Sequence, residues 1–156
     1  MRKLVIDRAA IKNNLTVIKD RAAGAAIYGV VTGDGQGVGA AALAQLLRDE
    51  GIGRFAVSEV SEAEALRQAG LDEEILMLRA TTDREELERL VDLNVVCTVS
   101  SVDTGMALNA LAGNRSTVAE AHIQVDTGMG FGGFLVSEPE KLLLAYRSMP
   151  NVALSG

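Results

Sequence analysis

The fold is decided by the stretch Ala26-Ile27-Tyr28-Gly29-Val30-Val31-Thr32-Gly33-Asp34-Gly35-Gln36-Gly37-Val38-Gly39. An apolar run enters a turn rich in glycine, and a segment rich in alanine and leucine leaves it. This order predicts a strand over residues 26–31, a turn over residues 32–39 and a helix from Ala40 to Glu50. Glycine lets the backbone bend sharply or approach a ligand, and a helix N-terminus offers free N–H groups to an anion. The turn is therefore the first candidate binding site.

The rest of the chain repeats this alternation. Strands are predicted over residues 54–58, 75–78, 95–99, 118–125 and 152–154, and helices over 8–21, 62–68, 83–91, 101–113 and 137–147. Met1–Ile6 reads as a short strand or a lead-in. The expected helix starts are Asp7, a capping box of Ser61 with Glu64, Thr81 or Thr82, Ser101 or Asp103, and Ser137 followed by Pro139.

Strands that alternate with helices imply a mostly parallel sheet with right-handed crossovers. One architecture that fits is a partial (β/α)8 barrel over residues 1–156, a single α/β domain with five βα units and the start of a sixth parallel strand. The other is an open doubly wound sheet. In both, a ligand sits at the carboxyl ends of the strands.

Composition narrows the class of protein. The formal net charge is −6, which argues against nucleic acid as a partner. Cys97 is the only cysteine, so the chain has no internal disulfide and no cysteine zinc cluster. His122 is the only histidine and lies inside a predicted strand, where packing is a better interpretation than catalysis or metal binding. We expect no metal site, no membrane span and a cytoplasmic location.

Two glycine turns carry motifs that allow more than one interpretation. Gly37-Val38-Gly39-Ala40-Ala41-Ala42 matches the dinucleotide pattern G-x-G-x-x-A, with Glu59 as a ribose acceptor, but the turn before Gly37 is longer than that pattern uses. The second turn is Val125-Asp126-Thr127-Gly128-Met129-Gly130-Phe131-Gly132-Gly133-Phe134. There Asp126 either orients a partner or simply caps the turn.

Together, the two turns resemble the N-terminal barrel domain of the alanine racemase family, the fold type III pyridoxal-phosphate (PLP) racemases. The first family motif is V-V-K-A-[DN]-A-Y-G-H-G, which matches residues 30–39 here, and the second is K-[VI]-D-T-G-M-G-R-x-G-F, which matches residues 124–134. The stretches 55–70 and 6–15 resemble the family's F-G-V-A…E-A…L-R-x-A-G and I-D-L…N-L segments. The resemblance implies a barrel fold, the cofactor PLP and an amino-acid substrate.

The chain departs from the family at the residues that carry its chemistry. Thr32 stands where the family has the lysine that forms the Schiff base, and Gln36 where it has a tyrosine that contacts the cofactor phosphate. Phe131 and Gln124 replace an arginine and a lysine of the second motif. A threonine hydroxyl cannot form a Schiff base. The other family residues of the active site lie downstream of position 156.

The resemblance and its departures lead to one expectation and two alternatives. We expect a pseudoenzyme, a racemase-related isomerase domain that is inactive as it stands and holds PLP at most non-covalently, at Thr32, Gln36, Gly37 and Gly39. No lysine follows a predicted strand to replace the missing one. The first alternative is a fragment or active-site variant of an active racemase, whose partners are an amino acid and PLP. The second is an oligomeric scaffold without a cofactor, since open sheet edges predict a homo-oligomer.

Overall fold

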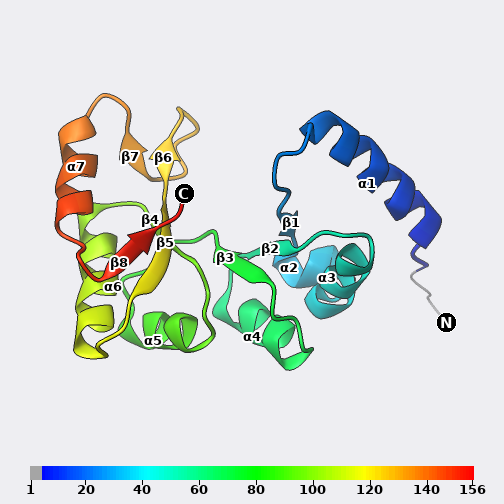
Figure 1. Ribbon diagram of the computed structural model, residues 1–156, viewed down its shortest axis with the longest axis horizontal. Coiled ribbons are helices and arrows are strands. Elements are labelled where there is room, and N and C mark those ends of the chain that lie inside the picture. The colour runs from blue at the N-terminus through cyan, green and yellow to red at the C-terminus, as the bar shows by residue number, and fades with distance from the viewer. Residues whose placement is uncertain (1–4) are drawn as a thin grey trace.

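The computed structural model describes residues 5–156, and Figure 1 shows its course. In chain order the elements are α1 (Arg8–Ala22), β1 (Gly29–Val30), α2 (Thr32–Gly37), α3 (Ala40–Asp49), β2 (Arg54–Val57), α4 (Val60–Gln68), β3 (Glu74–Met77), α5 (Arg84–Asp92), β4 (Cys97–Val99), α6 (Val102–Asn114), β5 (Ala119–Ile123), β6 (Val125–Asp126), β7 (Phe134–Leu135), α7 (Pro139–Arg147) and β8 (Val152–Leu154). The alternation of strands and helices is confirmed. The strand or lead-in predicted over Met1–Ile6 lies mostly outside the described residues, and residues 5–7 form no strand.

The main strands are parallel and follow one another in sequence order. One sheet has the order β1-β2-β3 and a second the order β4-β5-β8, and an isolated parallel bridge between Leu76 and Val96 links the two. The short strands β6 and β7 pair separately, with Val125 opposite Phe134. The strand predicted over residues 26–31 is reduced to β1, because only Gly29 and Val30 pair with β2.

The sheet curls like a barrel wall. In the sheet order β2, β3 and β4 separate β1 from β5, so a flat sheet would hold them roughly 19 Å apart at about 4.8 Å per strand. The ring of Tyr28, just before β1, and the ring of His122, on β5, have centroids only 6.3 Å apart, at an angle of 83°. Strands β1 and β5 therefore face each other across the concave side of the sheet, and the open doubly wound sheet is wrong.

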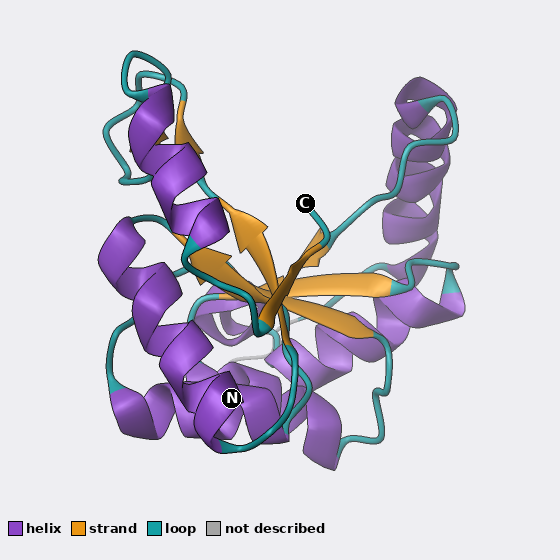
Figure 2. Cartoon of the chain, turned by 60° about the vertical axis from the view of Figure 1, so that its left-hand side comes forward, coloured by secondary structure: helices purple, strands orange, loops and turns teal. Residues whose placement is uncertain are grey.

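Helices cover the convex side of this sheet (Figure 2). Consecutive helices from α3 to α7 contact one another, α4 packs on β2 and β3, and α6 packs on β4, β5 and β8. The side chains that they bury come from alternate strand positions, among them Phe55, Val57, Ile75, Met77 and Val99. Alternation of this kind is the period of a strand, and it leaves the intervening side chains on the concave side.

A polar cluster occupies the concave side near the start of the strands. Tyr28 donates a hydrogen bond to Glu74, and the Arg54 guanidinium lies 5.7 Å from the Tyr28 ring centroid and 3.6 Å from Glu74. Burial, and then the Glu74 carboxylate, raise the pKa of Tyr28 to about 12. On β5, His122 packs against Tyr28 and Gly156, where an added Cβ would lie 2.8 Å from the imidazole. His122 is thus a packing residue, as the sequence predicts.

Several helix starts differ from the predicted residues. Asp83 caps α5 by accepting from the backbone of the first turn, and Thr81 instead accepts from the Asp83 N–H at 3.0 Å. The alternative Thr82 is not the cap either. The cap residue of α7 is Glu138 rather than Ser137. Asp7 and Ser101 cap α1 and α6, as predicted.

Candidate functional site

The first glycine turn forms a short left-handed coil at the carboxyl end of β1. Residues 33–36 have φ between 52° and 62° and ψ between 32° and 49°, the left-handed helical region. Gly33 and Gly35 adopt this conformation freely, whereas for Asp34 and Gln36 it costs about 1–2 kcal/mol of conformational free energy each. At Gly35 a Cβ would also lie 3.1 Å from the Ala40 nitrogen, so only glycine fits closely there. Other contacts must offset the strain at Asp34 and Gln36.

Those contacts come from within the chain. The Asp34 N–H donates to Glu62 Oε1 at 3.1 Å, and the Asp34 carboxylate accepts from the Ala40 N–H at 3.0 Å. The N–H groups of Gly35 and Gly39 donate to the carbonyls of Val31 and Asp34. Most of the backbone N–H groups of this turn, which we expected to be available to an anion, therefore already have hydrogen-bond partners within the chain.

Glu62 joins the first two loops at the carboxyl ends of the strands. It is 9% exposed and is the buried charged residue of the described chain. Besides the Asp34 N–H, it accepts at Oε2 from the N–H groups of Ser58 at 3.0 Å and Glu59 at 3.1 Å. Three backbone donors satisfy this carboxylate, which supplies the charged acceptor that a buried helix start needs.

The capping box predicted at the start of α4 is therefore wrong in position. It pairs Glu59 with Glu62, two residues earlier than Ser61 with Glu64. Sequence reasoning missed Glu62 as a site residue, although the spacing Glu-x-x-Glu before an apolar run was a usable signal. The Asp34 N–H from the first loop also donates to Glu62, and this contact adds to the hydrogen bonds that hold Glu62 in the third position of the helix.

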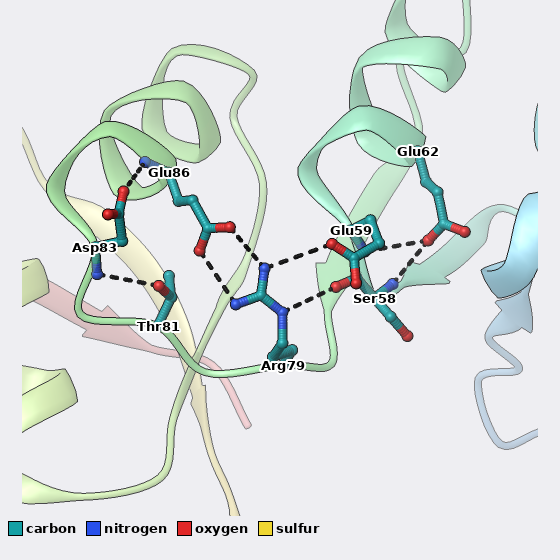
Figure 3. A network of polar contacts seen from close by, with 7 residues as sticks. All are labelled: Ser58, Glu59, Glu62, Arg79, Thr81, Asp83 and Glu86. Atoms are coloured by element: carbon teal, nitrogen blue, oxygen red, sulfur yellow. Dashed lines mark hydrogen bonds and ion pairs between the residues drawn. The ribbon is translucent and has the colours of Figure 1, made fainter.

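A network of ion pairs continues from Glu62 to the third strand (Figure 3). Arg79, just after β3, donates to the Ser58 carbonyl at 3.3 Å and to both oxygens of Glu86 at 3.1 and 2.8 Å, and lies 3.7 Å from Glu59. The two hydrogen bonds from Arg79 hold the pKa of Glu86 below its ordinary value. Glu59 pairs with Arg79 and caps the start of α4. These contacts give no support to the interpretation of Glu59 as the residue that binds the ribose of a dinucleotide.

The second glycine turn is capped by Asp126. Its Oδ1 accepts from the N–H groups of Gly128 at 2.8 Å and Gly130 at 3.1 Å, and these bonds lower the pKa of its carboxyl group. Of the two roles that the sequence left open for Asp126, the structure shows the cap. Gly133 is required because a Cβ would lie 2.7 Å from the Gln124 carbonyl oxygen.

The structure brings some of the predicted site residues together and leaves others apart. Thr32 is half-buried at the end of β1, and Gln36 donates to the Thr32 carbonyl at 3.4 Å. Gly37 closes α2 and Gly39 precedes α3 in the same turn. Phe131 lies on the second turn and is 80% exposed, and its carbonyl accepts from Gln124 at 3.5 Å. Within the described residues, no hydrogen bond joins Phe131 to the first turn.

Lysine side chains and possible metal-ligating side chains are two further kinds of group that could carry chemistry at a candidate site. Lys12 and Lys19 lie on α1, and Lys141 lies in the first turn of α7, where Glu138 raises the pKa of its ammonium group. Lys3 is outside the described residues. Over residues 5–156, no group of three or more His, Cys, Asp or Glu side chains is placed to hold a metal ion. In the same range, no helix is long and apolar enough to cross a membrane.

A curled parallel sheet, a convex layer of helices, and loops with polar side chains at the carboxyl ends of the strands define a protein of the TIM-barrel-like α/β class. Within that class, the family model described as alanine racemase, N-terminal domain, matches residues 6–156, and the chain belongs to this family.

Individual relatives agree with this assignment. The chain is 34% identical over 153 residues to an alanine racemase of Clostridium tetani, covering 97% of this chain and 39% of that one. The crystal structure of alanine racemase from E. faecalis superposes with a TM-score of 0.83 at 31% identity, over 97% of this chain and 41% of that one. The alanine racemase of Bacillus anthracis with bound L-Ala-P gives 0.84 at 29% identity, over 97% and 39%. The chain thus spans about two fifths of the length of these relatives.

Proposed function

We propose that this chain is the first part of a racemase-type (β/α)8 barrel, with five βα units and the start of a sixth strand, and that it does not racemise amino acids as it stands. Thr32 carries the proposal. It follows β1 at the position of the family lysine, and its hydroxyl cannot form the covalent bond to PLP on which racemisation depends. The cofactor supplies the electron sink for that chemistry when it is bound covalently.

The residues around Thr32 do not fit PLP as a tightly held cofactor. Asp34, Gly35, Gly39 and Ala40 already donate their N–H groups within the chain, so the turn offers few donors to a phosphate group. Glu62 places a negative charge beside the same turn. We therefore expect non-covalent binding of PLP at most.

Lys141 is the described lysine that comes nearest to the carboxyl ends of the strands, because it lies in the first turn of α7. Its Nζ donates to Glu138 at 2.7 Å, and this contact raises the pKa of its ammonium group. Lys141 lies on a helix and not directly after a strand, as Thr32 does, so we do not expect it to replace the missing lysine.

A fragment or an active-site variant of an active racemase is the second candidate. The share of the relatives that the chain covers, 36–40%, favours it. On this proposal the amino-acid substrate and PLP belong to the whole protein, and the residues that hold them lie beyond the matched segment.

An oligomeric scaffold is the third candidate, and the edges of the sheet favour it. Within residues 5–156, β1 pairs with β2 alone and β8 with β5 alone, and Val30 on β1 is 49% exposed. Unpaired strands at an edge are templates for association with another chain. A mass that rises with protein concentration, unchanged by PLP, would support this candidate.

The experiment that tests inactivity combines two readouts on the purified chain. PLP is added, the mixture is reduced with borohydride, and the intact mass and peptide map are measured. In parallel, exchange of the alanine α-proton is followed by NMR in D2O, with an intact alanine racemase as positive control. We expect no stoichiometric adduct and no exchange above background. A single stoichiometric adduct together with α-proton exchange would overturn the proposal.

The variant Thr32→Lys separates the first two candidates. If the lysine is the only loss, this variant forms a reduced adduct at residue 32 and exchanges the α-proton of alanine. We expect an adduct without exchange, because Phe131 still replaces the family arginine. The variant Thr81→Lys, which places a lysine after β3 instead, controls for adducts that any exposed amine would form.

A further inference from the structure

Helix α1 is set apart from the other long helices of the chain. Figure 1 shows it extending away from the layer that α3 to α7 form over the sheet. Leu15 is its one buried residue, whereas Val17 and Ile18 are 48% and 49% exposed. A helix on the surface of a globular protein normally buries a whole apolar stripe. The apolar contact that holds α1 to the rest of the chain is therefore small.

Polar contacts attach α1 to one place, the carboxyl end of α3. Arg8 lies 3.2 Å from Asp49, and Lys12 lies 3.8 Å from Glu50. The Lys19 ammonium donates to the Glu50 carbonyl, where the negative end of the α3 dipole favours a cation. Ion pairs with side chains as exposed as those of Arg8 and Lys12 contribute little to stability. The attachment of α1 is specific in its charges but weak.

The charge of α1 is opposite to that of the chain as a whole. Between Arg8 and Ala22 the helix carries four basic side chains and one acidic side chain, a formal charge of +3, although the net charge of the chain is −6. A basic helix is attracted to an acidic surface. The acidic surface that fits α1 in this structure is the end of α3, and a second copy of the chain presents the same surface.

The connection between α1 and β1 contains a strained turn. Ala23 has a φ of 50° and Gly24 a φ of 89°, and the Ala25 N–H donates to the Ala22 carbonyl at 2.9 Å. The left-handed conformation is unfavourable for alanine, so opening the turn relieves strain at Ala23. Residues 23–28 span about 20 Å when they are extended, which is enough to carry α1 to a neighbouring copy.

We propose that α1 exchanges between two copies of the chain, so that α1 of each copy docks on the end of α3 of the other. In this closed, two-fold symmetric dimer, the same ion pairs and the same Leu15 contact form between chains instead of within one chain, and the turn at Ala23 is open. Such an exchange creates a dimer without any new type of contact. The inference goes beyond the proposed function, because it depends neither on Thr32 nor on pairing of the sheet edges.

The test uses isotope mixing and a zero-length cross-linker. Equal amounts of unlabelled and 15N-labelled chain are unfolded together, refolded at high protein concentration and separated by size. A carbodiimide then couples Lys12 to Glu50, whose charged atoms lie 3.8 Å apart, and the linked peptides are weighed. In the dimer fraction, exchange of α1 should give about half of the Lys12–Glu50 links one labelled and one unlabelled peptide. In the monomer fraction, both peptides should come from the same chain.

The pair of Lys141 and Glu138 is the internal control. Their charged atoms lie 2.7 Å apart at the start of α7, three positions apart in sequence, so their link stays within one chain in monomer and dimer. The proposal is overturned if no dimer fraction forms, or if the Lys12–Glu50 links of the dimer join peptides of one chain only. The second result would indicate association through the sheet edges instead. Neither readout involves PLP or alanine, so the outcome is independent of the test of inactivity.

The variant Gly24→Ala tests the role of the turn. An added Cβ meets nothing within 4 Å at Gly24, so the substitution acts only through its φ of +89°, which alanine disfavours. The closed turn should therefore become less stable, and the association constant of the dimer should rise at least about fivefold. Gly53→Ala is the matched control, because its Cβ also meets nothing and its φ is not positive. Equal association constants for the two variants, measured by sedimentation, would contradict an exchange that opens this turn.

Discussion

The substitution Glu62→Gln tests whether one buried carboxylate holds the first two loops together. Glu62 is 9% exposed and accepts from three backbone N–H groups at 3.0–3.1 Å. A glutamine has almost the same shape but only one acceptor oxygen. Its amide group would face at least one of these donors with an N–H of its own, so that donor would lose its partner.

The expected loss of stability follows from the number of hydrogen bonds that the substitution removes or weakens. A hydrogen bond to a charged group contributes about 1.5–3 kcal/mol, and a buried donor left without a partner costs about 1–3 kcal/mol. One lost acceptor and the weakening of the others therefore predict a destabilisation of about 2–4 kcal/mol. For a chain of this length, that corresponds to a decrease in Tm of roughly 5–15 °C.

Denaturant unfolding at one fixed protein concentration measures the change, because association would otherwise alter the apparent stability. Hydrogen exchange adds a local readout: the amides of Asp34, Ser58 and Glu59 should lose protection first. The control is Glu64→Gln on the same helix, which removes a surface ion pair with Arg89 and should cost at most about 1 kcal/mol. Equal stabilities of the two variants would refute the argument that Glu62 organises these loops.

Three further predictions concern other parts of the chain. Gly33→Ala should destabilise by about 1–2 kcal/mol in denaturant unfolding, whereas Gly53→Ala should not, since a Cβ meets nothing within 4 Å at either position and only Gly33 has a positive φ, +62°. Stability should fall as the pH rises from about 10 through about 12, because folding raises the pKa of Tyr28 to about 12 and the folded chain therefore keeps the Tyr28 proton to a higher pH than the unfolded chain. The variant Tyr28→Phe should remove this part of the alkaline unfolding profile, and an unchanged profile would count against the raised pKa. Asp126→Asn should lower the protection of the amides of residues 128 and 130 against hydrogen exchange. In the unsubstituted chain, the same loss of protection should appear as the pH falls below the ordinary carboxyl range, because backbone hydrogen bonds lower the pKa of Asp126; equal protection factors at neutral and acidic pH would contradict it.

Much of the fold follows from local sequence patterns. Asp7 and Ser101 cap their helices as expected because capping depends on a side chain and the backbone two or three residues away. The main strands were placed correctly in order, since a short apolar run between turn residues needs no distant information. The prediction over residues 118–125 was wrong in part, because the structure divides it into β5 and β6 and pairs β6 with β7, which was not predicted. Their ends were less predictable: β1 is shorter than its apolar run because pairing with β2, not hydrophobicity, sets where a strand begins.

The barrel-like curvature of the sheet could not be predicted from local sequence patterns. A parallel sheet of these strands is compatible with both a flat and a curled form, and the difference appears only when Tyr28 and His122 meet across four strand spacings. The resemblance to a barrel family supplied the answer that periodicity left open. Sequence reasoning could have listed both residues, but nothing in their own neighbourhoods predicted the contact between them.

The candidate site shows the same division between local and distant information. The loss of a lysine at Thr32 is visible in the sequence, because it depends on one side chain and its chemistry. The engagement of the turn by Glu62 is not visible, because it joins residues 28 positions apart through a backbone N–H. This difference matters for any attempt to restore activity. A lysine at position 32 supplies the missing amine, but the left-handed turn that presents it is fixed by Glu62 and by Asp34, so the direction of that amine is set by residues that the family motif alone does not reveal.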